Sequence, residues 1–166
     1  MAREGSIAIV AAEGKDFAAI WAMLEATIRA GETFALPREM TRDDALAYWF
    51  APGNHVFAAR VGAVTAGSFF VRANAAGGGG HVANAGFVTA PTLRNRGVAR
   101  AMGEHALAVA RRLEFTAMQF NFVVSSNEAA VHLWKSLGFG VAGTLPRAFK
   151  MPSGEACDVF VMYREL

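Results

Sequence analysis

The sequence is poor in cysteine and contains no long apolar run. Cys157 is the only cysteine, so the chain cannot form an internal disulfide and is compatible with a reducing compartment. The first ten residues, MAREGSIAIV, lack the apolar segment and cleavage site of a secretory signal. The most apolar stretch, 56–71, is interrupted by Arg60 and by glycines, which predicts two strands and a turn and argues against a membrane span. We therefore expect a cytoplasmic protein without membrane contact.

Charged residues are also scarce. They make up 18% of the chain against 54% hydrophobic residues, and the formal net charge is only +2. This composition is typical of a folded chain, and 166 residues suit a single domain spanning 1–166. The arginines are spread along the chain, with one concentration at Arg94, Arg96 and Arg100. Nucleic-acid binding requires a broad basic face, so we expect no nucleic-acid partner and favour a small anionic ligand at one place.

The sequence also lacks the motifs of a metal site and of a nucleotide-binding P-loop. The histidines show no metal-ligand spacing with Cys157 or with one another, so no metal is predicted; they are His55, His81, His105 and His132. The glycine run 77–80 is not followed by Lys-Ser or Lys-Thr, which excludes a P-loop of nucleotide hydrolases. We interpret this run as the tip of a hairpin.

Hydrophobic periodicity predicts an alternation of strands and helices. The predicted strands are 6–12, 56–61, 65–72, 81–89, 117–124, 141–145 and 158–163. Helices are predicted after an Asp16 cap, from Thr41, over 96–113, and after a capping box of Ser125 and Glu128. Gly138 and Phe139 predict a Schellman ending of the last helix, with Phe139 packed on Trp134. The succession of strand, helix and strand over 81–124 predicts two parallel neighbouring strands.

The segment 87–100 carries the most informative pattern. A strand ends at Thr89, a short loop contains Gly97, and a helix follows. A helix start leaves backbone N–H groups unpaired and carries the positive end of the helix dipole, so it binds phosphate oxygens. Gly97 has no Cβ and lets a diphosphate approach the backbone, and Ala99 keeps the next turn small. An ordinary strand-to-helix turn with solvated arginines is the alternative.

Two motifs carry a resemblance to a known family. Arg94-x-x-Gly97-x-Ala99 resembles the acetyl-CoA signature of the GCN5-related N-acetyltransferase (GNAT) superfamily, Gln/Arg-x-x-Gly-x-Gly/Ala. The run Asn127-x-x-Ala130-x-x-Leu133-Trp134-Lys135-x-x-Gly138-Phe139 resembles the second signature, on the helix after the fifth strand. The order of predicted elements is similar to that of the family over nearly the whole chain.

The resemblance implies an α/β (α+β) fold with a mixed central sheet of about seven strands and helices on both faces. Strands 81–89 and 117–124 would be parallel and would splay apart at their C-terminal ends. Acetyl-CoA would bind as co-substrate, its pantetheine arm pairing with the edge of 87–89 and its diphosphate held at 94–99. The implied cofactor-binding residues are Phe87, Val88, Thr89, Arg94, Asn95, Arg96, Gly97, Val98, Ala99, Arg100, Asn127 and Trp134.

The resemblance also implies the reaction, in which the amine of a small molecule attacks the thioester directly. In this family the loop between the first two helices covers the acceptor. Glu32 in that loop is therefore a candidate base or ammonium anchor, and Phe34 a candidate substrate contact. Asp43 and Asp44 are further candidates. The alternative for Glu32 is a solvated loop carboxylate.

Asn84 and Asn121 are polar residues within apolar strands, on the two strands expected to splay. A buried amide needs a hydrogen-bond partner, so both are candidate catalytic and substrate-binding residues. The arrangement, together with the segment 143–149, is similar to fungal acetyltransferases acting on proline analogues, in which strand asparagines face the acceptor carboxylate. An amino acid or an analogue is therefore a candidate acceptor. The alternative is that one asparagine satisfies strand backbone at a bulge.

Trp134 stands where many family members carry tyrosine as general acid. An indole N–H has no usable acidity, so Trp134 cannot protonate the departing thiolate and is expected to pack as a wall. A thiol pKa of about 8.5 allows the thiolate to leave with help from water. A CoA-binding sensor without turnover and a protein N-acetyltransferase remain open alternatives. A homodimer is common in the family, and the sequence does not identify the acceptor.

Overall fold

The computed structural model describes residues 6–166, and its elements follow the predicted order. The strands are β1 (Ile7–Ala11), β2 (His55–Val61), β3 (Val64–Ala73), β4 (Val82–Thr89), β5 (Ala117–Val124), β6 (Gly140–Lys150) and β7 (Ala156–Glu165). The helices are α1 (Phe17–Ala30), α2 (Arg42–Trp49), α3 (Val98–Arg112) and α4 (Glu128–Ser136). Short 3₁₀ turns cover 14–16, 77–79 and 91–93.

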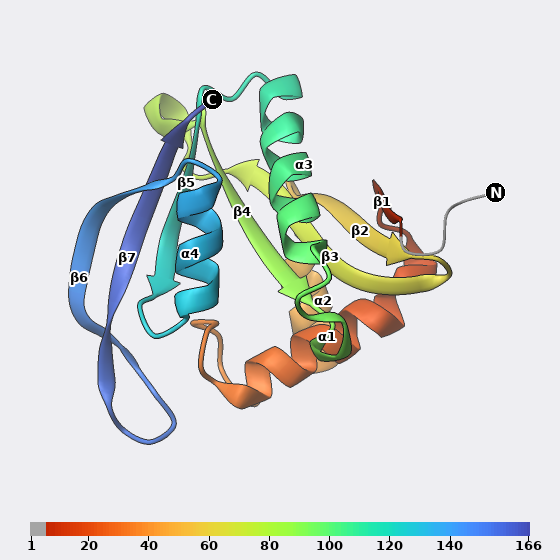
Figure 1. The fold of residues 1–166 in the computed structure, drawn as a ribbon, viewed down its shortest axis with the longest axis horizontal. Coiled ribbons are helices and arrows are strands. Elements are labelled where there is room, and N and C mark those ends of the chain that lie inside the picture. Colours follow the sequence, from red (N-terminus) through yellow and green to blue (C-terminus); the bar gives the residue numbers. More distant parts are fainter. Residues whose placement is uncertain (1–5) are drawn as a thin grey trace.

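The described strands form one mixed sheet in the order β1-β2-β3-β4-β5-β7-β6. Only β4 and β5 are parallel neighbours; every other neighbouring pair is antiparallel. Helices α3 and α4 cover one face of this sheet, and α1 and α2 cover the other (Figure 1). The predicted α/β fold with a sheet of seven strands is confirmed. No helix of the described part is both long enough and apolar enough to cross a bilayer.

Strand β3 lies inside the sheet, between β2 and β4, and most of its residues are buried. Successive side chains of a strand point to opposite faces. Phe69 and Val71 accordingly pack in the cluster that holds α3 and α4, whereas Phe70 packs in the cluster that holds α1 and α2. Both layers of helices therefore pack against this one interior strand.

Positive-φ glycines end two helices, and the ending at Gly138 is the predicted one. Gly31 follows α1 with φ of 66°, and Gly138 follows α4 with φ of 87°. The N–H of Gly138 donates to the carbonyl of Lys135 and the N–H of Phe139 to that of Trp134, both at 3.0 Å. These two bonds define a Schellman motif, so that prediction is confirmed.

Helix α1 begins directly after Asp16, as predicted, but the side-chain caps expected at two helix starts are absent. Asp16 makes no side-chain cap bond to α1, because its carboxylate accepts hydrogen bonds from Arg60 and Thr65 instead. Ser125 does not cap α4: its N–H still pairs with the carbonyl of Asp158 at 2.9 Å, which extends the sheet. Asn127 is the N-cap of α4 and accepts from the N–H of Ala130 at 3.4 Å.

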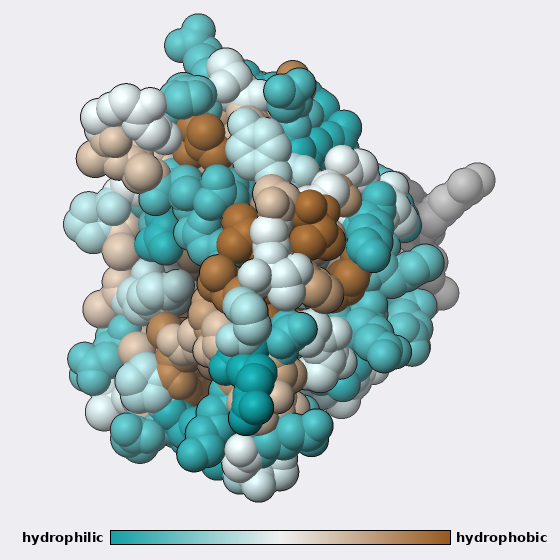
Figure 2. Space-filling model, turned by 90° about the vertical axis from the view of Figure 1, so that its left-hand side faces the viewer, coloured by the Kyte–Doolittle hydropathy of each residue, from teal (hydrophilic) through white to brown (hydrophobic). Residues whose placement is uncertain are grey.

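Two other boundaries also differ from prediction. Helix α3 begins at Val98 and not at Arg96, because Asn95 and Gly97 adopt left-handed backbone, with φ of 62° and 78°. Strand β6 is longer than predicted and runs to Lys150 along the edge of the sheet. Val141 and Leu145 of β6 are among the exposed large hydrophobic residues. Figure 2 shows this side of the molecule, where hydrophobic patches lie among hydrophilic residues.

Strands β4 and β5 pair over only a short distance. Their ladder consists of Val82 with Ala117 and Ala83 with Met118, although each strand has eight residues. Beyond these pairs the two strands diverge toward their C-terminal ends, as Figure 1 shows. The predicted splay is therefore present, and it creates a fork in the middle of the sheet.

Candidate functional site

A cavity of about 900 Å³ opens at the fork between β4 and β5. Its lining comes from both strands, from the beginning of α3, from α4 and from the segment 32–36 after α1. Elements distant in the sequence thus meet at one site. The cavity takes in all the residues proposed from the sequence except Arg96, Asp43 and Asp44.

One wall of the cavity is an open strand edge. Residues 87–89 of β4 pair with β3 on one side, where Phe87 lies opposite Phe69 and Thr89 opposite Gly67. On the other side, the pairing with β5 has already ended at Ala83. The backbone groups that face β5 along 87–89 therefore have no strand partner among the described residues. Such an edge can pair with an extended, peptide-like ligand.

The beginning of α3 presents unpaired N–H groups at the same cavity. Gly97 is the N-cap, and the N–H of Ala101 makes the first helical bond to its carbonyl at 2.9 Å. Helix geometry leaves the N–H groups of Val98, Ala99 and Arg100 without helical acceptors. A Cβ placed on Gly97 would meet only Ile7 Cδ1, at 4.0 Å, so the space beside this residue is open. These features suit the binding of an anion.

The arginines around this helix start are arranged unequally. Arg94 and Arg100 line the cavity, whereas Arg96 is exposed in the loop and does not line it. Arg100 also donates from Nη2 to Ser136 Oγ on α4 at 2.7 Å. Two guanidinium groups and the helix dipole therefore add positive potential at this end of the cavity.

Trp134 forms a wall opposite the open edge. Its side chain is buried, with ring centroids 4.8 Å from Phe87 and 4.7 Å from Phe120. The expectation that this residue packs is met, and the indole still lines the cavity. Asn127 lines the cavity as well, although its Oδ1 is used to cap α4.

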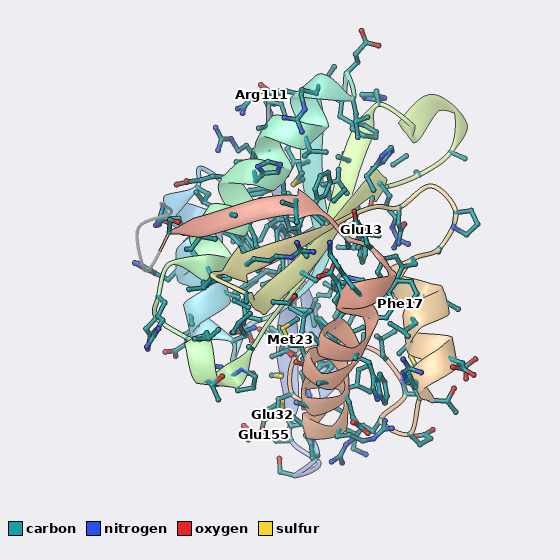
Figure 3. All side chains as sticks on the ribbon, turned by 90° about the vertical axis from the view of Figure 1, so that its right-hand side faces the viewer. Glu13, Phe17, Met23, Glu32, Arg111 and Glu155 are labelled. Carbon is teal, nitrogen blue, oxygen red and sulfur yellow. The ribbon has the colours of Figure 1, made fainter. Side chains whose placement is uncertain are left out.

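Glu32 and Phe34 line the cavity from the other side. Figure 3 shows Glu32 just beyond the end of α1, with Glu13 and Phe17 at the opposite end. The Phe34 ring lies 6.4 Å from the Trp49 ring, which ties this loop to α2. Glu32 is the one carboxylate residue among the described lining residues. Asp43 and Asp44 do not line the cavity; they lie in the first turn of α2.

The two asparagines have different environments. Asn84 is buried and donates from Nδ2 to the Gln119 carbonyl on β5 at 2.9 Å, where the backbone pairing has just ended. Asn121 is exposed within a bulge of β5, and its Nδ2 donates to Asn74 Oδ1 at 2.6 Å. Asn84 thus satisfies strand backbone, as the alternative prediction had it, although it lies at the end of a ladder and not at a bulge. Both residues still line the cavity.

The sequence interpretation missed three prominent lining residues. Tyr48 and Trp49 lie on α2, and Arg72 lies near the end of β3. Two signals were visible in the sequence: an aromatic pair on a short helix, and a cation near the end of an apolar strand. Neither signal shows which face each side chain takes, because that depends on packing between α2 and the sheet.

Comparison with known proteins gives consistent matches. The model of the Acetyltransferase (GNAT) family matches residues 18–139. N-acetyltransferase aca1 of Schizosaccharomyces pombe is 27% identical over 144 residues, which cover 77% of this chain and 69% of that protein. The structure of a GCN5-related N-acetyltransferase from Kribbella flavida is 38% identical with a TM-score of 0.91, over 96% of this chain and 98% of that chain. A structure of yncA from Salmonella typhimurium with its cofactor acetyl-CoA shares the fold, at 22% identity and a TM-score of 0.86, over 97% of this chain and 94% of that chain.

Proposed function

The chain belongs to the acetyltransferase (GNAT) family, and on that basis we propose that it moves the acetyl group of acetyl-CoA to the amine of a small molecule. Its class is that of an N-acetyltransferase with acetyl-CoA as donor. The observation that supports the proposal is the combination of an open β4 edge with the unpaired N–H groups of α3 in one cavity.

The residues present fit the donor. The edge of 87–89 can pair with the amide groups of the pantetheine arm, as a strand would. The N–H groups that follow Gly97, with Arg94 and Arg100, hold the diphosphate. Trp134 and Asn127 close the opposite wall. When bound, acetyl-CoA supplies an activated thioester.

The chain's own residues then act on the acceptor. An ammonium group has no lone pair, so the acceptor must lose a proton before it attacks. Glu32 is the lining carboxylate and takes this proton, directly or through water. Asn84 and Asn121 hold the acceptor at the fork beside the thioester, and Phe34 covers it. Positioning supplies much of the rate enhancement. Trp134 donates no proton, so water protonates the thiolate.

An amine panel tests this function. Purified protein is mixed with acetyl-CoA and with small amines, amino acids and peptides, and free thiol is measured. We expect thiol release with small amines and little with peptides. Turnover confined to peptides would favour a protein N-acetyltransferase, and CoA binding without any turnover would favour a sensor. Cytoplasmic location and a homodimer remain predictions.

Gly97→Glu tests the placement of the donor. The new carboxylate would face the diphosphate, and like charges placed together cost several kcal/mol, so Kd for acetyl-CoA should rise at least about 100-fold. Glutamate at a positive φ is also strained, and Gly53→Glu controls for that strain. Gly53 has φ of 89°, has no atom within 4 Å of an added Cβ, and does not line the cavity. Equal acetyl-CoA affinity in both variants would contradict the placement.

A further inference from the structure

We propose that Arg72 is the receptor for a carboxylate carried by the acceptor, so that the substrates are amino acids rather than simple amines. This inference rests on the proposed function. It starts from Arg72, a cation that lines the cavity away from the proposed diphosphate site at the start of α3.

Arg72 is a half-buried cation that lies beside two adjacent aromatic rings. Its Cζ lies 5.1 Å from the Phe70 ring centroid and 5.9 Å from that of Tyr48. No carboxylate of the described residues forms an ion pair with it, and it donates no hydrogen bond to them. The rings supply a weak cation–π attraction and leave its N–H donors available.

The position of Arg72 brings it to the fork. Arg72 on β3 lies directly opposite Asn84 on β4, and directly opposite residues of antiparallel strands share a face. Asn84 spans the point where β4 and β5 separate. The guanidinium group of Arg72 therefore lies on the acceptor side of the open strand edge, near α2, and not at the start of α3.

The charges lining the cavity separate into two groups. Arg94 and Arg100 belong to the start of α3, where the diphosphate is placed. Glu32 and Arg72 are the other charged residues among the described lining. An amino acid has an ammonium group and a carboxylate, and this pair of opposite charges can receive both. A guanidinium group binds a carboxylate through two parallel N–H bonds, which is stronger than a neutral contact.

Arg72 suits a carboxylate better than the asparagines do. The amide nitrogen of Asn84 already donates to the Gln119 carbonyl, and that of Asn121 donates to Asn74. Arg72 lines the cavity, and none of its guanidinium N–H donors is used in a described hydrogen bond. Arg72 thus determines the preference for substrates with a carboxylate. The amide nitrogens of Asn84 and Asn121 stabilise the neighbouring β4–β5 fork through their own hydrogen bonds.

Pairs of amino acids and their carboxamides test this role. Both members of a pair carry the same amine and side chain, and only the acid carries the negative charge. We expect wild-type kcat/KM to favour the acid by about 10- to 100-fold, the range of charged hydrogen bonds. In Arg72→Gln the ratio of acid to carboxamide should fall to about one, and Arg72→Lys should recover part of it.

Arg111→Gln provides the matched control. Arg111 is exposed in the last turn of α3, does not line the cavity, and undergoes the same change of charge (Figure 3). Its acid-to-carboxamide ratio should equal that of wild type. Thermal unfolding and acetyl-CoA affinity of Arg72→Gln show whether the fold and the donor site are intact.

Two results would overturn the role of Arg72. One is a wild-type enzyme that acetylates acids and carboxamides equally well; the other is an unchanged ratio in Arg72→Gln. If no amine releases thiol, the proposed function fails separately. Calorimetry of the same pairs binding to the protein–CoA complex then decides the role of Arg72, because a preference for the acid that is lost in Arg72→Gln supports it and equal binding of both forms rejects it.

Discussion

At the residue scale, Asp16 is the one buried charged residue of the part that the structure describes. It is buried and accepts from Arg60 Nη2 at 2.9 Å, from Thr65 Oγ1 at 3.1 Å and from the Glu13 N–H at 2.9 Å. Burial acts to raise the pKa of this carboxyl, but the hydrogen bonds from Glu13, Arg60 and Thr65 outweigh it and hold the pKa below its ordinary value. Asp16 therefore ties the start of α1 to the sheet in its charged form.

Asp16→Asn should lower the free energy of unfolding at pH 7 by about 2 to 4 kcal/mol, because Arg60 would lose its charged partner. The pKa of Asp16 is lower in the folded state, so its contribution is fully present above the unfolded value of about 3.9 and is lost as the pH falls through the folded value. Urea titrations of wild type and Asp16→Asn at pH 7 and below pH 4 measure the difference in the free energy of unfolding at each pH.

Asp43→Asn is the control for Asp16→Asn. Asp43 is exposed in the first turn of α2, so its replacement should change stability by less than about 0.5 kcal/mol. The difference between Asp16→Asn and wild type should shrink at low pH. A difference that stays constant over the whole pH range would contradict the role of the charged carboxylate.

At the scale of the element, the side chain of Asn84 bridges β4 and β5 at the point where their backbone pairing ends. The Asn84 amide donates to the Gln119 carbonyl immediately after the last backbone pair, Ala83 with Met118. A side-chain hydrogen bond thus takes the place of the next backbone hydrogen bond, and the two strands separate beyond it. A bulge between Phe120 and Val123 bends β5 on its other side.

Asn84→Ala should lower the free energy of unfolding by about 1 to 3 kcal/mol, because the Gln119 carbonyl would lose its donor in a buried place. Acetyl-CoA should also bind more weakly, since the strands that hold it lose their fixed separation. Urea unfolding and calorimetry with acetyl-CoA measure the two effects. Asn121→Ala is the matched control for stability, because Asn121 is exposed. Equal stability of the two variants would contradict a role of Asn84 at the fork.

At the scale of the whole molecule, the cavity joins elements from both halves of the sheet. Strands β1 to β4 form a continuous antiparallel half, and β5, β7 and β6 form the other. Among the described strands, the only ladder between the two halves is the short parallel one at the fork, and side-chain bonds from Asn84 to Gln119 and from Asn121 to Asn74 add to it. A ligand that pairs with the open β4 edge and contacts α4 therefore connects them.

Acetyl-CoA at about 100 times its Kd should raise the free energy of unfolding by about 2.7 kcal/mol and the melting temperature by about 5 to 10 °C. Amide hydrogen exchange should slow at residues 87–89 and at the start of α3, because these N–H groups acquire acceptors. The β1–β2 pairing serves as an internal control and should gain little local protection. Slower exchange at β1 and β2 alone would place the ligand elsewhere.

Much of the site was predictable because its signals are local. Gly97, the spacing of Arg94 and Ala99, and the run from Asn127 to Phe139 predicted a helix start and a second helix, and both lie at the cavity. The cap bond expected from Asp16 to α1 and the start of α4 at Ser125 were wrong, because Asp16 and Ser125 make contacts with distant strands. A local sequence pattern cannot show that a distant strand will compete with a helix end for the same polar group.

The sequence by itself determined the order of the elements, the Schellman ending at Gly138 and a loop with Gly97 before the start of α3. These features follow from contacts within a few residues and from backbone preferences that each residue carries everywhere. Only the tertiary structure decided where β4 leaves β5, that Asp16 pairs with Arg60, and that Arg72 and Tyr48 meet at the cavity. Those outcomes depend on strand register and on the packing of helices against the sheet, which arise from many distant contacts acting together.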